Sequence, residues 1–234
     1  CPAGNVGVQV NHLSPVNKGE TVWTVDPTFV LFFGRLFNTG KVNLKRTIAI
    51  GGSAISTPEY VEALIGTPFA DILKDAFKCQ EGIRLINGNP LTGIKSSLED
   101  SVGVKTSEIT AIPEGDHADE MLGWILPRTN QLSTSHSYFS WLLGKKEYDL
   151  DARIKGGERH IIMSGEYDKV LPMDIYGEFL IKAIIAGDID KMEQLGIYEV
   201  SPEDFAVAEF VDSSKLELQR IVREGLDMLR KENA

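Results

Sequence analysis

The sequence has few cysteines and few basic residues. Two cysteines, Cys1 and Cys79, stand in 234 residues, too few for a disulfide-stapled secreted scaffold or a four-thiolate iron–sulfur cluster. The sequence leaves open whether the two form a disulfide. The ordinary interpretation is one buried and one terminal thiol in a reducing compartment. The 34 acidic residues exceed the 24 basic ones and give a net charge of −10. This balance argues against nucleic-acid binding and against electrostatic adsorption to an anionic membrane.

Long apolar runs and targeting signals are also missing. No stretch approaches the roughly 20 apolar residues that a membrane-spanning helix needs. The richest run, residues 29–37, is interrupted by Gly34 and Arg35. No basic region followed by an apolar run stands at the N-terminus, so no secretory signal is predicted. The sequence begins without Met and enters an alternation of valines at once, so we expect a chain cut from a longer protein.

Motifs for cofactors and nucleophilic catalysis are scarce. Gly51-Gly52-Ser53 and Gly144-Lys145-Lys146 lack the spacing of a dinucleotide-binding or phosphate-binding loop. A turn at the end of a strand explains the first of them better. No Gly-x-Ser-x-Gly elbow is present, and the adjacency of Ser135 and His136 does not indicate a triad, which is defined by spatial geometry.

The acidic and histidine residues do not form a metal-ligand pattern. Residues 116–120 hold three carboxylates and an imidazole, but consecutive side chains in a turn point in different directions, so we expect a solvated hairpin loop. Asp188-Ile189-Asp190 begins like a calcium loop but lacks its glycine and its bidentate glutamate. The four histidines are scattered: His12, His117, His136 and His160. The sequence therefore predicts no catalytic, cofactor-binding or metal-binding residue on this chain.

The pattern along the chain predicts an α+β fold that begins with a partial domain at residues 1–44. Val6, Val8 and Val10 alternate like a strand, and residues 22–25 form a second extended piece. Asp26-Pro27 favours a helix start, and the helix to residue 37 is apolar on nearly every face, which predicts burial. We interpret this section as the end of a nucleotide-binding-like, Rossmann-like α/β domain.

Residues 45–127 are predicted to form a β-grasp domain, in which a helix lies across a sheet. The helix is opened by an N-cap at Thr67 and Pro68 at the first helical position. Its apolar stripe consists of Phe69, Ile72, Leu73 and Ala76. Asn87-Gly88-Asn89-Pro90 reads as a turn. Strands are predicted at residues 47–50, 60–63, 83–86, 104–112 and 123–126.

The rest of the chain is predicted to be a connector, residues 128–164, followed by a helical bundle at residues 165–234. The connector contains a short helix at residues 139–143. Asp174 caps a bundle helix that ends before Gly187, and Asp188 caps a short one that ends at Leu195-Gly196. Ser201-Pro202-Glu203-Asp204 starts a third helix, and a fourth starts near Ser214. The last helix has one apolar face, formed by Leu218, Ile221, Val222, Gly225 and Leu229.

Several stretches resemble a known family in order and spacing. They are residues 165–175, 187–196 and 201–206, with Pro2-Ala3-Gly4, Gly66-Thr67-Pro68 and residues 87–93 upstream. These residues are similar to the A subunit of the sodium-translocating NADH:quinone oxidoreductase, and the similarity extends over essentially the whole chain.

The resemblance implies a fold similar to the flavin- and NADH-binding subunit of respiratory complex I, without the residues for flavin, NADH or cluster. The middle domain would be a soluble-ligand-binding β-grasp (SLBB) domain. The helical domain resembles a cluster-binding domain that has lost its cluster. In agreement, residues 165–234 contain no Cys, and Asp212 stands where many relatives carry one.

The resemblance also implies a function. The enzyme complex oxidises NADH, reduces ubiquinone or menaquinone and translocates Na⁺, with its flavins and iron–sulfur cluster on other subunits. This chain would be a non-catalytic, peripheral subunit on the cytoplasmic face of the bacterial inner membrane. Its partner would chiefly be the quinone-reducing membrane subunit, and its roles would be docking, through the helical bundle and the β-grasp domain, and quinone access.

Two alternatives belong to other classes. A free-standing β-grasp ligand-binding module is normally secreted or repeated, and neither feature is visible in the sequence. The related electron-transport subunit of ferredoxin-linked complexes carries Cys-x-x-Cys clusters, which this sequence lacks.

Overall fold

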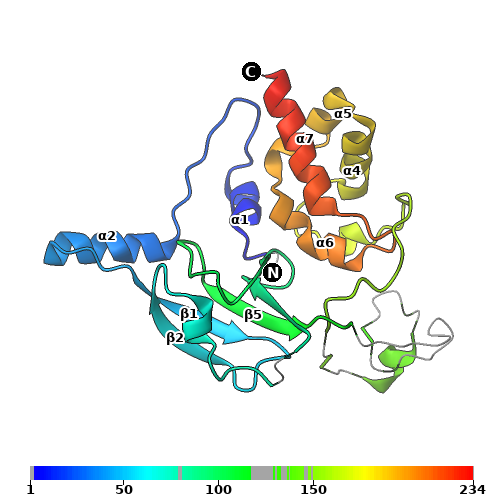
Figure 1. Ribbon diagram of the computed structural model, residues 1–234. Coiled ribbons are helices and arrows are strands. Elements are labelled where there is room, and N and C mark those ends of the chain that lie inside the picture. Colours follow the sequence, from blue (N-terminus) through cyan, green and yellow to red (C-terminus); the bar gives the residue numbers. More distant parts are fainter. Residues whose placement is uncertain are drawn as a thin grey trace. The chain divides into compact units, whose positions relative to one another are not determined.

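The chain forms two compact units with a mixed α+β fold (Figure 1). The computed structural model describes residues 3–78, 81–116, 129, 131–132, 136, 138–144, 147–148 and 150–233. The sheet unit comprises Pro27–Arg153, and the helical unit combines Cys1–Asp26 with Ile154–Ala234. The α+β class predicted from the sequence is confirmed.

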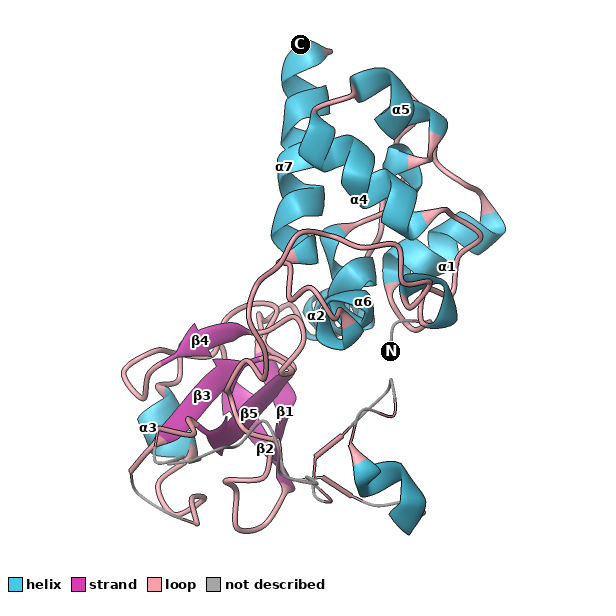
Figure 2. Cartoon of the chain, turned by 90° about the vertical axis from the view of Figure 1, so that its right-hand side faces the viewer, coloured by secondary structure: helices cyan, strands magenta, loops and turns pink. Residues whose placement is uncertain are grey.

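The sheet unit is built on a five-stranded sheet in the described part of the chain, with strand order β2-β1-β5-β3-β4. Strand β1 pairs antiparallel with β2 and parallel with β5, and β3 pairs antiparallel with both β5 and β4. Figure 2 shows these strands in magenta with the short helix α3 beside them. The strands are β1 (Lys45–Gly51), β2 (Glu59–Leu64), β3 (Ile83–Asn87), β4 (Ile94–Ser96) and β5 (Glu108–Pro113).

The core of the sheet unit lies between the inner face of the sheet and α3. Strand β1 alternates, so Ile48 and Ile50 point inward. Helix α3 (Phe69–Ile72) adds Phe69 and Leu73 to the same cluster. The predicted stripe is confirmed, because Ile72 and Ala76 are half-buried against the same cluster. The helix itself is only one turn long.

The expected cap of α3 is wrong by one residue. Pro68 occupies the N-cap position. The backbone of Thr67 instead makes two hydrogen bonds: its N–H donates to Leu64 O and its carbonyl accepts from Val102 N. Thr67 therefore belongs to the turn between β2 and α3.

Four of the five predicted strands are confirmed, and one of them begins later than predicted. The predicted strand at 104–112 begins at Glu108, β4 was not predicted, and residues 123–126 lie outside the described residues.

The predicted turn after β3 is present, and the Asn89 side-chain oxygen accepts from Leu91 N and Thr92 N, both at 2.9 Å. Residues 22–25 join no strand of this sheet. The predicted helix at 139–143 is the 3₁₀ helix η1 (Phe139–Leu143).

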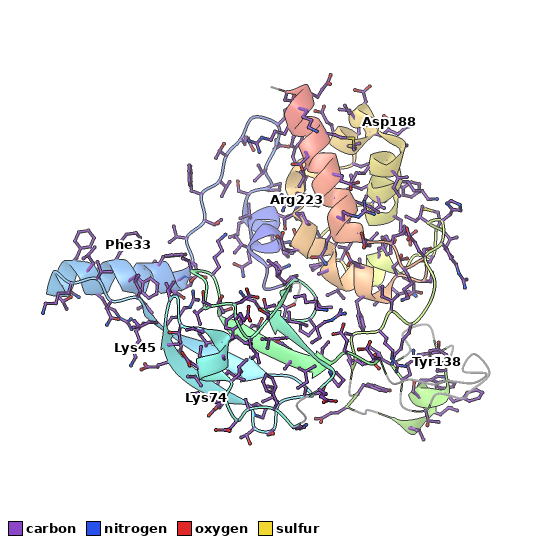
Figure 3. The ribbon with its side chains drawn as sticks, viewed as in Figure 1. Phe33, Lys45, Lys74, Tyr138, Asp188 and Arg223 are labelled. Atoms are coloured by element: carbon purple, nitrogen blue, oxygen red, sulfur yellow. The ribbon has the colours of Figure 1, made fainter. Side chains whose placement is uncertain are left out.

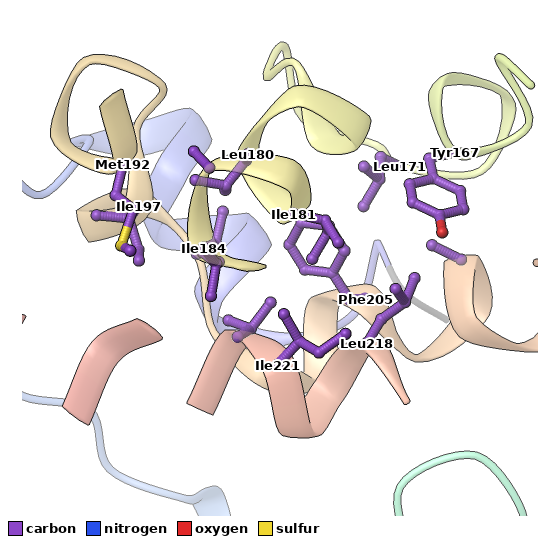
Figure 4. Packing of buried hydrophobic residues seen from close by; sticks show 14 of the residues in the cluster. Tyr167, Leu171, Leu180, Ile181, Ile184, Met192, Ile197, Phe205, Leu218 and Ile221 are labelled. Atoms are coloured by element: carbon purple, nitrogen blue, oxygen red, sulfur yellow. The ribbon is translucent and has the colours of Figure 1, made fainter. Parts of the chain in front are cut away.

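The helical unit encloses its own apolar core (Figure 4). Side chains of α4, such as Leu180, Ile181 and Ile184, pack against Phe205 and Leu218. The predicted face of the last helix is confirmed, since its five residues are all buried. The elements are α1 (Val6–Leu13), η2 (Tyr167–Lys169), α4 (Gly177–Ala186), α5 (Ile189–Gln194), η3 (Ile197–Glu199), η4 (Pro202–Phe205), α6 (Ala206–Val211) and α7 (Leu218–Glu232).

Two predicted caps are confirmed and two helix starts are wrong. Asp188 caps α5 by accepting from Lys191 N, and Ser201 starts η4, where Asp204 Oδ2 accepts from Ser201 N at 2.9 Å. Asp174 caps no helix, because α4 begins at Gly177. Helix α7 begins four residues after Ser214, because Asp212 accepts from Ser214 N and Leu216 N and holds that segment in a turn.

The predicted strand at Val6, Val8 and Val10 is wrong, because residues 6–13 form α1. Val8 is buried in the helical core, while Val6 is exposed and Val10 half-buried. Polar side chains attach this segment to the bundle: Asn11 Nδ2 donates to Glu199 Oε2 at 2.7 Å, and Lys18 Nζ lies 2.8 Å from Glu193 Oε1. These tertiary contacts override the β-propensity of valine.

The buried position of Leu73 gives the first testable prediction. Its side chain is 1 % exposed, so Leu73→Ala should lower the free energy of unfolding by about 2–5 kcal/mol through lost burial and a residual cavity. Leu64→Ala, on an exposed side chain of β2, is the control and should change it by less than about 0.5 kcal/mol. Chemical denaturation measures both, and equal effects of the two variants would contradict the assignment of the core.

Gly7 provides a test of how α1 packs against the helical bundle. A Cβ at this position would lie 2.6 Å from Asp204 Oδ2 and 3.1 Å from Ser201 Oγ. Alanine normally stabilises a helix by about 1 kcal/mol relative to glycine, but overpacking costs about 1–3 kcal/mol. We therefore expect Gly7→Ala to destabilise the protein in thermal unfolding.

Gly4→Ala is the matched control, because no atom lies within 4 Å of its added Cβ. A Gly7→Ala protein at least as stable as the wild type would show that α1 does not pack on the bundle in solution.

Candidate interaction surfaces

The buried carboxylates of the helical unit are engaged with backbone amides and small hydroxyls. Glu178 Oε1 accepts from Gly165 N at 2.7 Å, from Ser164 N at 3.1 Å and from Ser164 Oγ at 3.0 Å. Such bonds satisfy a carboxylate taken out of water. The arrangement fixes the loop before η2 to α4, which is a structural task.

Asp212 lies next to the phenol of Tyr167, and the pair is buried. Burial first, and then the negative charge of Asp212, raise the pKa of Tyr167 above its ordinary value. Both oxygens of Asp212 accept from the turn before α7, at 3.1 Å from Ser214 N and 2.8 Å from Leu216 N. Within the described ranges, no three His, Cys, Asp or Glu residues gather at metal-binding distance.

The histidines singled out in the sequence make separate local contacts. His12 Nε2 lies 3.0 Å from Pro172 O, the ring of His136 stacks on Trp141 at 5.2 Å between centroids, and the backbone carbonyl of His160 accepts from Ser214 Oγ. Asp116 is described, whereas residues 117–120 and 133–135 lie outside the described residues.

The glycine pair at the end of β1 allows the backbones of β1 and β5 to approach closely. Gly52 has a φ of +115°, and a Cβ there would lie 2.1 Å from the carbonyl oxygen of Ala111 on β5. Only glycine permits this approach of the two backbones. The observation supports the interpretation of Gly51-Gly52-Ser53 as a turn. Gly144 is described, but Lys145 and Lys146 are not.

Exposed apolar side chains are a candidate feature for binding that the sequence analysis did not identify. On the helical unit, Tyr176 and Phe179 are 70 % and 54 % exposed, and their rings meet edge to face at 6.2 Å and 87°. We call this pair the α4 aromatic pair. The opposite side of α4 supplies Leu180, Ile181 and Ile184 to the core. The i, i+3 spacing of the two aromatics was the available signal.

Helix α2 (Pro27–Thr39) carries a second exposed apolar surface, on the sheet unit. Val30, Phe33 and Phe37 follow the spacing i, i+3, i+7, so they share one side of the helix, which we call the α2 outer stripe. Phe33 and Phe37 are 57 % and 84 % exposed, and Figure 3 shows Phe33 on α2. The helix was predicted correctly, but its expected burial is wrong for the described residues, where Phe32 alone is buried.

No helix among the described residues has the length and apolarity required to cross a membrane.

Comparison with known proteins gives two family matches. Residues 1–42 match the family model described as the NqrA second alpha/beta domain. Residues 47–97 match the model described as the NQRA C-terminal domain, an SLBB domain.

Curated relatives match nearly the whole chain. A Neisseria meningitidis serogroup C protein is 32 % identical over 232 residues, which is 99 % of this chain and 52 % of the relative. A Vibrio anguillarum protein is 32 % identical over 99 % of this chain and 52 % of its own length, and one from Alcanivorax borkumensis is 34 % identical over 99 % and 51 %.

All three relatives are named as the A subunit of the Na(+)-translocating NADH-quinone reductase. The chain spans about half the length of the curated relatives it matches. The two domain matches occur in order along the chain, and the relatives cover both. The chain therefore belongs to the family formed by the A subunit of the Na⁺-translocating NADH-quinone reductase.

Proposed function

We propose that this chain acts as a docking part of a sodium-translocating NADH:quinone oxidoreductase and carries no redox chemistry itself. The single observation that carries the proposal is the α4 aromatic pair, two large exposed side chains on a unit whose buried carboxylates are engaged in its own fold. Aromatic side chains of this kind are typical anchors of protein interfaces. The relatives are named as one subunit of a reductase, which supports assembly with other subunits.

The partner that we propose is the quinone-reducing membrane subunit, with the protein placed peripherally on the cytoplasmic face of the membrane. NADH, flavins, the iron–sulfur cluster and Na⁺ would be handled by other subunits, and this chain would contribute docking and access for ubiquinone or menaquinone. Engagement of Asp212 and Glu178 with backbone amides supports a structural role for the region that resembles a cluster domain.

We propose the predicted domain divisions on the same basis. The strand order β2-β1-β5-β3-β4, with β1 and β5 parallel and α3 against one face, supports a β-grasp domain at residues 45–127. The match of residues 1–42 to an alpha/beta domain supports a Rossmann-like assignment for residues 1–44. Residues 128–164 would connect these parts to the helical domain at 165–234.

The docking role is tested by replacing both aromatics in the full-length protein, Tyr176→Ser with Phe179→Ser. Loss of two interface anchors should reduce copurification with the other pump subunits at least about 10-fold, since an anchor contributes about 2 kcal/mol or more. Quinone reduction in membranes should fall with it, while NADH oxidation with an artificial acceptor survives.

Tyr60→Ser, at an exposed tyrosine of β2, is the matched control and should leave copurification unchanged. Thermal unfolding checks that the double variant is folded. Normal copurification by the folded double variant, with or without loss of quinone reduction, would contradict docking through α4.

A further inference from the structure

We propose that the 3₁₀ helix η1 inserts into the surface of an anionic lipid bilayer, so that this chain contacts lipid directly as well as docking on other subunits. The inference rests on the proposed peripheral placement at the membrane, but it concerns the sheet unit, whereas the α4 aromatic pair belongs to the helical unit. The residues that carry it, which we call the η1 apolar residues, are Phe139, Trp141, Leu142 and Leu143.

The polarity of η1 is the reverse of that expected for a helix in water. Phe139, Trp141, Leu142 and Leu143 are 57 %, 48 %, 61 % and 58 % exposed. The polar side chain among them, Ser140, is 1 % exposed, and its hydroxyl has no hydrogen-bond partner in the described part of the chain. Burial of an unpaired hydroxyl and exposure of large apolar groups are both unfavourable in water. The segment is therefore suited to an apolar environment.

The η1 apolar residues occupy every side of the helix. A 3₁₀ helix has three residues per turn, so residues at i and i+3 lie in one row. Phe139 and Leu142 form one row, Trp141 lies in the second, and Leu143 shares the third with Ser140. A protein partner normally covers one apolar face of a short helix, whereas lipid can surround all of its exposed sides. This arrangement favours lipid as the occupant.

The side-chain types of η1 are those of a membrane interface. Tryptophan and tyrosine are enriched at the level of the lipid headgroups, and leucine and phenylalanine insert beside the acyl chains. Tyr138, labelled in Figure 3, is the N-cap residue of η1 and is half-buried. The ring of His136 stacks on Trp141 and supports one side of the indole. A helix of five residues can enter the interface but is too short to cross the bilayer.

The charge of the surrounding sequence is complementary to an anionic bilayer. Residues 121–146 contain no Asp or Glu, but they include Arg128, Lys145 and Lys146. Basic residues close to an apolar anchor strengthen its attachment to anionic lipids. The net charge of −10 argues against adsorption of the chain as a whole. It does not oppose a local contact, because exposed charges farther away than about 8 Å are largely screened at physiological salt.

Fluorescence quenching in the assembled pump tests the occupant. Leu142→Cys is introduced into the full-length protein after Cys1→Ser and Cys79→Ser, labelled with nitrobenzoxadiazole and reconstituted with the other subunits in vesicles of phosphatidylethanolamine and phosphatidylglycerol. We expect nitroxides on the upper acyl chains to abolish the emission, because interfacial segments lie about 5–10 Å into the headgroup and acyl boundary. Aqueous iodide should leave the emission unchanged. Leu143→Cys repeats the measurement, and Ile94→Cys, at an exposed residue of β4, should show the reverse.

Vesicle sedimentation of the purified full-length protein tests the charge. Partition into the same lipid mixture should be at least about 5-fold stronger than into phosphatidylcholine, which is the contribution of one basic side chain near an anionic surface. Trp141→Ser with Leu142→Ser should reduce this partition at least about 10-fold through lost apolar burial. Ile94→Ser should leave it unchanged, and thermal unfolding checks that each variant is folded.

Three results would overturn the proposal. Quenching of the probe at position 142 by iodide would show that η1 faces solvent. A probe shielded from both quenchers would assign the cover to another subunit. Equal partition into both kinds of vesicle, or into neither, would exclude anionic lipid as the occupant. All three would leave the copurification experiment on the α4 aromatic pair unaffected, so the two proposals fail separately.

Discussion

Two helices, α2 and α4, carry apolar side chains on two sides, and each can bury only one side within its own unit. In α4 the inner side forms the centre of the helical core, so the fold of that unit depends on it. The outer side then exposes Tyr176 and Phe179. In α2 the attached side buries Phe32, and the outer stripe stays uncovered. Burial of apolar area at roughly 25 cal/mol per Å² makes such surfaces costly in water, which favours partners for both.

The polar interior is consistent with a scaffold. Glu178 and Asp212, which would be candidates for chemistry by burial alone, each accept several hydrogen bonds from loops that they hold in place. The raised pKa of Tyr167 follows from the same burial beside Asp212. Carboxylates used in this way stabilise the turns that orient α4 and α7, and thus the position of the α4 aromatic pair.

Local signals in the sequence predicted those parts of the fold that depend on short-range chemistry. The strand at residues 47–50, the caps at Asp188 and Ser201 and the apolar face of α7 depend on neighbouring residues, and all are confirmed. The prediction of a strand at Val6–Val10 was wrong because contacts with residues far along the sequence stabilise a helix there. One example is the hydrogen bond from Asn11 to Glu199, 188 positions away. The exposed surfaces were missed because an apolar pattern predicts that a face is buried without saying by what.

Photocrosslinking from position 176 in native membranes is the most direct test of the central claim, that this protein docks on the pump through α4. A benzophenone amino acid would replace Tyr176, which is 70 % exposed, in one protein and Tyr60, which is 81 % exposed, in another. We expect position 176, but not position 60, to crosslink to the quinone-reducing membrane subunit. Crosslinks from position 176 that reach no component of the pump, in membranes where the assembled complex retains quinone reduction, would contradict the account.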